Sequence, residues 1–201
     1  MNQIAIVDYG VGNLKSVSNA FRYLGVPTCI TSEGAELERA DAIILPGVGA
    51  FPNAAEKLRA SGLDRVVLEQ GRKKPVLGIC LGMQLLLETS MELRICTGLG
   101  AVQGVVDRIS TTLKLPHIGW NTLSFHGDSP LFQGLEDGVS VYFVHSFSAQ
   151  DTPKEQVVAT TEYGTDVIAA VQNGNFFGCQ FHPEKSGDVG LFMLKNFAAL
   201  A

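Results

Sequence analysis

One cysteine, Cys80, lies between two glycines at the junction of two different kinds of sequence. Residues 75–79 before it are mostly apolar, which is typical of a buried parallel strand. Residues 84–88 after it are good helix formers without glycine or proline. The Gly-Ile-Cys-Leu-Gly pattern at 78–82 therefore predicts a nucleophile elbow, a sharp strand-to-helix turn that lifts a reactive side chain out of a sheet. The flanking glycines would leave room for close packing, and the positive end of the helix would favour the thiolate.

A histidine and a carboxylate that could serve such a nucleophile occur near the end of the chain, in Gln-Phe-His-Pro-Glu-Lys at 180–185. Because side chains alternate along a strand, Gln180, His182 and Glu184 are expected on one side of it. Glu184 could hold one ring nitrogen of His182 and leave the other for the nucleophile. Pro183 cannot donate a ladder hydrogen bond, so we place the pair at a strand end. Together with Cys80, these residues supply a nucleophile, a base and an orienting acid.

A purely structural interpretation stays open for each of these residues. Free cysteine is among the most buried residue types, so Cys80 could be a core thiol, and the histidine–glutamate pair could lie on a solvated strand end. Cys29, Cys96 and Cys179 have no elbow around them and are predicted to be structural. The Gly-Val-Gly at 10–12 is not a dinucleotide fingerprint, because Lys15 occupies the third glycine position.

Alternating strand and helix patterns in the first half must position Cys80. We expect strands over 3–8, 27–31, 41–45 and 75–80, a helix over 13–24 capped by Asn13, and a helical region over 53–73 broken near Gly62. Strand, helix and strand in repetition predict a largely parallel, doubly wound sheet flanked by helices.

The second half changes to successive strands joined by turns. They are predicted over 102–110, 120–126, 139–147, 157–162, 167–172 and 176–181, followed by a helix over 188–200. Asn173-Gly174 is a two-residue hairpin signal. We therefore expect an antiparallel addition to the same sheet, within a single domain that spans 1–201.

Composition narrows the possible partners. The chain has 201 residues, 46% of them hydrophobic, and a net charge of −5 without a cluster of Lys and Arg, so nucleic acid is not an expected partner. No apolar run has the length of a membrane span, and the N-terminus lacks the pattern of a signal peptide, so a cytoplasmic location is expected. The four cysteines form no Cys-x-x-Cys pair, so we expect neither disulfides nor a metal site, and no cofactor is expected.

Six blocks of sequence together resemble the class I glutamine amidotransferases with a Cys-His-Glu triad, and more narrowly the glutaminase subunits of imidazole glycerol phosphate synthases. They are Asp-Tyr-Gly-Val-Gly-Asn-Leu at 8–14, Leu-Pro-Gly-Val-Gly at 45–49, the elbow at 78–86, Leu-Pro-His-Ile-Gly-Trp-Asn at 115–121, Tyr-Phe-Val-His-Ser at 142–146 and the block at 180–186. The blocks at 115–121 and 142–146 point to the narrower group. The resemblance implies a flavodoxin-like class I glutamine amidotransferase fold and an enzyme of histidine biosynthesis, a lyase with glutamine hydrolase activity.

The resemblance also implies roles for individual residues. Cys80 would attack the side-chain amide of glutamine and form a thioester, His182 would transfer protons, and Glu184 would orient His182. The backbone N–H groups of Val48 and Leu81 would form the oxyanion hole. Substrate-binding residues implied in the same way are Gly49, Gln84 and Glu92. His117 and His145 lie in family blocks, and their roles stay open between the active site, the interface and the core.

A partner is expected, because free ammonia is lost unless a second enzyme consumes it at once. The resemblance implies a heterodimer with a (β/α)₈-barrel cyclase subunit that makes imidazole glycerol phosphate. The candidate contact residues are Asn13, Lys15, Trp120 and Lys185. Two alternatives remain: the glutaminase subunit of another ammonia-using synthase, such as those for anthranilate, GMP or pyridoxal phosphate, and a non-catalytic binding protein on the same fold.

Overall fold

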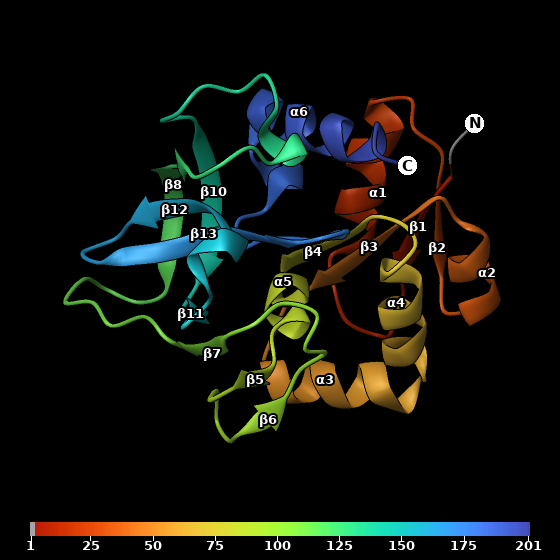
Figure 1. Ribbon diagram of the computed structural model, residues 1–201, viewed down its shortest axis with the longest axis horizontal. Helices are drawn as coiled ribbons and strands as arrows, with labels where there is room; N and C mark the ends of the chain where they lie inside the picture. Colours follow the sequence, from red (N-terminus) through yellow and green to blue (C-terminus); the bar gives the residue numbers. More distant parts are fainter. Residues whose placement is uncertain (1–2) are drawn as a thin grey trace.

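A computed structural model describes residues 3–201 and shows an α/β architecture built on one central sheet (Figure 1). The eight strands of this sheet run in the order β2 (Thr28–Thr31), β1 (Ile4–Val7), β3 (Ala42–Gly47), β4 (Val76–Cys80), β14 (Phe176–Cys179), β13 (Asp166–Asn173), β12 (Val157–Glu162) and β9 (Ser124–Phe125). The strands from β2 to β14 pair in parallel, and β13, β12 and β9 continue the sheet in antiparallel pairing. The predicted parallel sheet with an antiparallel addition is confirmed.

Helices cover both faces of the sheet because its central strands are apolar on both sides. On one face, Ile4 and Ile6 belong to an apolar cluster with residues of α1 (Leu14–Tyr23) and α6 (Gly187–Ala198). On the other face, Ala5 and Val7 pack in a second cluster with residues of four further helices. These are α2 (Gly34–Arg39), α3 (Phe51–Ala60), α4 (Leu63–Gly71) and α5 (Leu81–Leu86). Figure 1 shows α1 and α6 on the side of the sheet opposite to α3.

Two smaller sheets extend the second half beyond the central sheet. One pairs β8 (His117–Thr122) with β10 (Ser140–His145), and the other runs in the order β11 (Phe147–Gln150), β7 (Val105–Arg108), β5 (Thr89–Ser90) and β6 (Cys96–Thr97). The predicted continuous strand over 139–147 is therefore wrong: the chain leaves one sheet at His145 and enters another at Phe147. Short 3₁₀ turns lie at η1 (Pro130–Phe132), η2 (Lys154–Gln156) and η3 (Pro183–Lys185).

The predictions for the helices of the first half are confirmed at one position and wrong at two others. The helical region over 53–73 is interrupted as expected, at Gly62, whose φ of +73° is costly for other residues. Helix α2 was not predicted, because it is only six residues long and buries only Leu37. The predicted cap at Asn13 is absent. Asn13 occupies the N-cap position of α1, but its side-chain oxygen accepts a hydrogen bond from the hydroxyl of Ser16 instead of from a backbone N–H of the helix.

Within residues 3–201, no helix combines the length and apolar character needed to cross a membrane. The expectation about the extreme N-terminus involves Met1 and Asn2, which lie outside the described residues.

Candidate active site

Cys80 is the last residue of β4 and directly precedes α5, as the elbow pattern predicts. Its backbone has φ 54° and ψ −111°, a conformation that is uncommon for a residue other than glycine. The flanking elements hold it there, because β4 is hydrogen-bonded on both sides, to β3 and β14, and every residue of α5 is buried. Strain of this kind persists where the surrounding structure over-determines it, which is common at functional sites.

The two elbow glycines are required by space. A Cβ on Gly82 would lie 1.7 Å from the backbone oxygen of Leu45 in the neighbouring strand β3. A Cβ on Gly78 would lie 2.6 Å from the backbone oxygen of Gly82. The expected close approach is thus present at both positions, although Gly78 makes room for the elbow's own helix rather than for a neighbouring strand.

His182 and Glu184 meet as predicted, but not through strand alternation. The strand ends at Cys179 rather than at 181, and Glu184 lies in the 3₁₀ turn η3. Nδ1 of His182 is 2.8 Å from Oε1 of Glu184, and both side chains are almost completely buried. The amide of Asn13 also donates a hydrogen bond to Oε1 of Glu184, at 3.5 Å. A turn therefore brings the carboxylate to the ring, and Asn13, directly before helix α1, bonds the same carboxylate oxygen.

The position of the His182 backbone is fixed by hydrogen bonds that the sequence did not indicate. The N–H of His182 donates to the carbonyl of Tyr142 at 2.9 Å. The hydroxyl of Ser186 donates to the carbonyl of His182 at 2.7 Å and accepts from the N–H of Tyr142 at 3.0 Å. Strand β10 is thereby joined to the turn that carries the candidate base.

Two opposing effects act on the protonation of His182. Burial lowers the pKa of the imidazole, but interactions with the Cys80 sulfur and the Glu184 carboxylate raise it by more, to about 9. No described residue forms a hydrogen bond with the buried Nε2 atom, and Cys80 acts on His182 as one of the interactions that raise the pKa. The raised pKa favours the imidazolium form of His182, and a charged imidazole beside a cysteine is the surrounding expected of an activated nucleophile.

A cavity of about 420 Å³ opens above Cys80. Its lining includes seven of the residues predicted from the sequence: Val48, Gly49, Cys80, Leu81, Gln84, Glu92 and His182. Five further lining residues were not assigned to the site beforehand: Pro116, Val144, His145, Ser146 and Phe147. The signal for the first four was their position in the family blocks at 115–121 and 142–146, and Phe147 directly follows the second block. Glu184 does not line the cavity, because it lies behind His182.

The two residues predicted to form the oxyanion hole both line the cavity. Leu81 is the first residue of α5, so its N–H has no acceptor within the helix. Val48 follows strand β3 and is 42% exposed, and the next residue, Gly49, has a φ of +104°. The Val48 and Leu81 N–H groups thus belong to two segments that border the same cavity.

Glu92 has a structural contact as well as a place in the cavity wall. Its Oε2 atom accepts a hydrogen bond from the N–H of Phe51 at 2.8 Å. Phe51 is the first residue of α3, so the carboxylate satisfies one of the free N–H groups at the positive end of that helix. The second carboxylate oxygen has no hydrogen bond to a described residue that would compete with a ligand.

His145 and His117 form a buried pair beside the cavity. Nδ1 of His145 lies 2.8 Å from the carbonyl oxygen of Phe147, which can only accept, so Nδ1 carries the proton. Burial lowers the pKa of His145 to about 4 and keeps the ring neutral. Its Nε2 atom must therefore accept from Nδ1–H of His117, at 3.1 Å. Burial also lowers the pKa of His117, which stacks between Phe143 and Tyr163.

The four candidate contact residues lie outside the cavity, and three of them are close to the turn η3. Asn13 bonds Glu184, and Lys185 is the next residue along the chain. Trp120 is 59% exposed. Its ring lies beside Gly187, two residues after Lys185, since a Cβ added to this glycine would lie 4.0 Å from the ring. Lys15 is exposed on α1. The tertiary structure thus gathers three of the four around Glu184.

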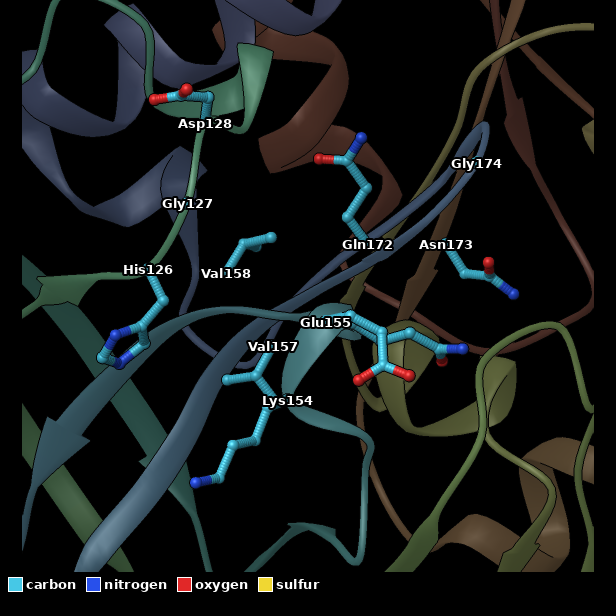
Figure 2. A pocket seen from close by; sticks show the side chains of 11 residues that line it. His126, Gly127, Asp128, Lys154, Glu155, Val157, Val158, Gln172, Asn173 and Gly174 are labelled. Atoms are coloured by element: carbon cyan, nitrogen blue, oxygen red, sulfur yellow. The ribbon is translucent and has the colours of Figure 1, made fainter.

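Figure 2 shows a different cavity, of about 390 Å³, which borders strands β12 and β13. It includes the Asn173–Gly174 turn that precedes β14, whereas His182 follows β14, so the two cavities lie at opposite ends of that strand. His126, Lys154 and Glu155 are among its lining residues, which include no cysteine or serine. The cavity at Cys80 is therefore the candidate active site. Among residues 3–201, no cluster of His, Cys, Asp and Glu has the arrangement of a metal site.

Comparison with known proteins places these features in a family. The family described as Glutamine amidotransferase class-I matches residues 5–200. The chain is 52% identical over 195 residues to proteins named "Imidazole glycerol phosphate synthase subunit HisH" from Bacillus anthracis and Bacillus cereus, covering 96% of this chain and 93% of each relative. Among solved structures, a glutamine amidotransferase has a TM-score of 0.76 at 20% identity, covering 96% of this chain and 98% of that one. A chain of PurLQS from Thermotoga maritima has a TM-score of 0.73 at 21% identity, covering 98% and 97%, and both likenesses concern the fold alone.

Proposed function

The chain belongs to the class I glutamine amidotransferases, and we propose that it is the glutaminase subunit of an imidazole glycerol phosphate synthase in histidine biosynthesis. In this proposal the chain is one catalytic domain that hydrolyses glutamine to glutamate and ammonia. The observation that carries it is the buried His182–Glu184 pair held against the elbow cysteine Cys80, in a chain with 52% identity to relatives of that name.

The first half of the reaction forms a thioester. The Cys80 thiolate attacks the side-chain amide carbon of glutamine and gives a tetrahedral oxyanion. The His182 imidazolium then donates its Nε2 proton to the leaving nitrogen, so that the C–N bond breaks and ammonia departs. Glu184 keeps the ring in this orientation through its bond to Nδ1.

The second half hydrolyses the thioester. The neutral His182 takes a proton from water, and the resulting hydroxide adds to the thioester carbon. Collapse of this second oxyanion breaks the C–S bond, releases glutamate and restores the thiolate and the imidazolium. The N–H groups of Val48 and Leu81 are the proposed donors to both oxyanions.

Gly49, Gln84 and Glu92 are the proposed glutamine-binding residues. The Nε2 atom of Gln84 already donates to two acceptors, so its Oε1 atom is the part left to accept from the substrate. One oxygen of Glu92 is used by α3, and the other could pair with the α-ammonium group of glutamine. The Oε1 atom of Gln84 and the unused oxygen of Glu92 thus suit a cationic group at the end of the substrate opposite to the scissile amide.

A partner completes the proposal, because the ammonia has to be used before it escapes. We propose a heterodimer with a (β/α)₈-barrel cyclase subunit that docks around Asn13, Lys15, Trp120 and Lys185. The exposed Trp120 supports this placement, since large aromatic side chains are enriched at the centres of interfaces. The four free cysteines are in keeping with a reducing, cytoplasmic location, which is part of the same proposal.

Glutamate release from glutamine tests the function. The purified chain is assayed alone, with a barrel cyclase, and with the cyclase and its nucleotide substrate, beside the variant Cys80→Ala. Activity that rises with the cyclase and vanishes in the variant is the expected result. Activity that rises with a different synthase instead would move the assignment to that synthase, and a folded chain inactive with every partner would overturn the enzymatic proposal.

A further inference from the structure

Gln180 is a completely buried polar residue between the end of β14 and His182, and the proposed reaction does not use it. Its side-chain amide makes two contacts. One atom lies 3.0 Å from Nε2 of Gln84, and the other lies 3.7 Å from the sulfur of Cys80. A buried amide with both ends engaged is held in one orientation, so the orientation can be deduced.

A backbone carbonyl sets the orientation of both amides. Nε2 of Gln84 lies 3.1 Å from the carbonyl oxygen of Phe147, which can only accept, so this end of Gln84 must be the donating NH₂ group. The same NH₂ group faces Gln180, so the nearer atom of Gln180 must be its oxygen. The remaining end of Gln180 is then its NH₂ group, and it points at the Cys80 sulfur.

The sulfur is therefore the acceptor in this contact. A thiolate accepts a hydrogen bond far better than a neutral thiol does, because charge strengthens the bond. Cys80 is only 7% exposed, so little water is available to stabilise a negative charge on it. A neutral amide donor stabilises that charge without adding a positive charge that would lower the pKa of His182.

We propose that Gln180 is a further residue of the catalytic site, a hydrogen-bond donor that stabilises the Cys80 thiolate and fixes its direction, while Gln84 fixes the amide of Gln180. The inference deepens the proposed function and rests on it in one respect, that Cys80 is the nucleophile. Gln84 thereby has two tasks, since one end orients Gln180 and the other faces the cavity.

The titratable groups that face the sulfur stay constant when Gln180 is replaced. They are His182 after β14, with Glu184 behind it, Tyr9 after β1, Cys179 at the end of β14, and Glu92 and His145 in the wall of the same cavity. A change in the pH dependence of Cys80 on replacing Gln180 therefore reports on the amide donor itself.

Alkylation of Cys80 by iodoacetamide, measured across pH on the full chain, tests the proposal without glutamine or a partner. Mass analysis of the peptide that contains Cys80 separates it from the other three cysteines. Gln180→Met keeps the volume but removes the donor. Hydrogen bonds to charged groups typically have the strength for a tenfold effect, so the rate at low pH should fall about tenfold, with an unchanged plateau at high pH.

Gln172→Met is the matched control, because it makes the same chemical change in β13, where the Gln172 amide oxygen accepts from the Ser129 hydroxyl away from Cys80. It should leave the alkylation profile as in the wild type. A merely structural role of Gln180 would lower the melting temperature but leave the pH profile in place. A wild-type profile in folded Gln180→Met overturns the proposal.

Should Gln180→Met not fold, Gln180→Asn takes its place under the same criterion, since it keeps an amide that is one carbon too short to reach the sulfur. Failure of this proposal is distinguishable from failure of the proposed function. Glutamate release with an unshifted alkylation profile would remove only the role of Gln180, whereas normal alkylation without any glutamate release would remove the glutaminase.

Discussion

Two buried cysteines end two neighbouring parallel strands, and only one of them has the surroundings of a nucleophile. Cys80 closes β4 and Cys179 closes β14, where it pairs in register with Ile79. Both belong to the same apolar cluster, with 7% and 1% of their surfaces exposed. Residue type, burial and strand position are therefore nearly the same for the two thiols.

Their neighbours differ. The backbone turns at Cys80 with a positive φ, and the sulfur faces Gln180 and His182. The Cys179 sulfur lies 3.8 Å from the carbonyl oxygen of Gly78, which accepts from its S–H, and burial raises the pKa of Cys179 well above its usual range. Burial therefore makes a thiol inert unless the backbone and nearby donors stabilise its anion.

The largest expected effect comes from removing the sulfur that faces the donors. Cys80→Ala should lower glutamate release by about 10⁴-fold or more, since loss of a nucleophile leaves only binding and oxyanion stabilisation. Release is measured with the partner cyclase and saturating glutamine. Residual activity within about tenfold of wild type would contradict the assignment of Cys80.

Weakening the base should have the next largest effect. Glu184→Gln keeps the shape of the side chain but removes the charge that orients the His182 ring and favours the imidazolium. We expect kcat for glutamate release to fall by about 10²- to 10⁴-fold, with a small change in KM. Asp188→Asn is a surface control for the charge change, because Asp188 is an exposed residue of α6. An equal loss in both variants would mean that the ion pair has no catalytic role.

The surroundings of the two thiols should change the unfolding free energy in different ranges of pH. The pKa of His182 is about 9 in the folded chain and 6.5 in the unfolded chain, so its stabilising contribution is complete below pH 6.5 and is lost as the pH rises through 9. The contribution is at most about 3 kcal/mol. Cys179 has a usual pKa of 9.0 and a higher one when folded, so it adds to the loss only above that pH.

Urea unfolding at intervals from pH 6 to pH 9 measures this contribution. Wild type should lose unfolding free energy across the interval, and His182→Gln should show a flatter dependence in the same range. Parallel curves for the two proteins would show that folding does not raise the pKa of His182.

The smallest effect is expected at the inert thiol. Cys179→Ala removes one buried sulfur from the core and should cost about 1–2 kcal/mol of unfolding free energy, while glutamate release stays within about twofold of wild type. Thermal or urea unfolding and the glutaminase assay measure the two outcomes. A loss of activity comparable with that of Cys80→Ala would end the contrast between the two cysteines.

Much of the fold could be predicted, and the candidate triad residues proposed, because their signals are local. The elbow needs only two glycines around a cysteine, and Gly62 interrupts a helix wherever its left-handed conformation is used. Short elements were missed for the opposite reason. Helix α2 buries only Leu37, so it carries almost no periodicity, and nothing in residues 139–147 indicates that the strand changes sheets.

Residue types and their spacing indicate which groups could react: a thiol at a strand-to-helix turn, and an imidazole with a carboxylate two residues away. How these groups are held depends on contacts between segments that are distant in the chain. Gln180 reaches a sulfur 100 positions earlier in the chain, and Asn13 reaches a carboxylate 171 positions later. Both contacts depend on sheet order, because β14 was placed beside β4 by pairing that forms between distant segments. Local preferences select the turn and the strand, whereas the neighbours of a buried side chain are set by packing over the whole chain.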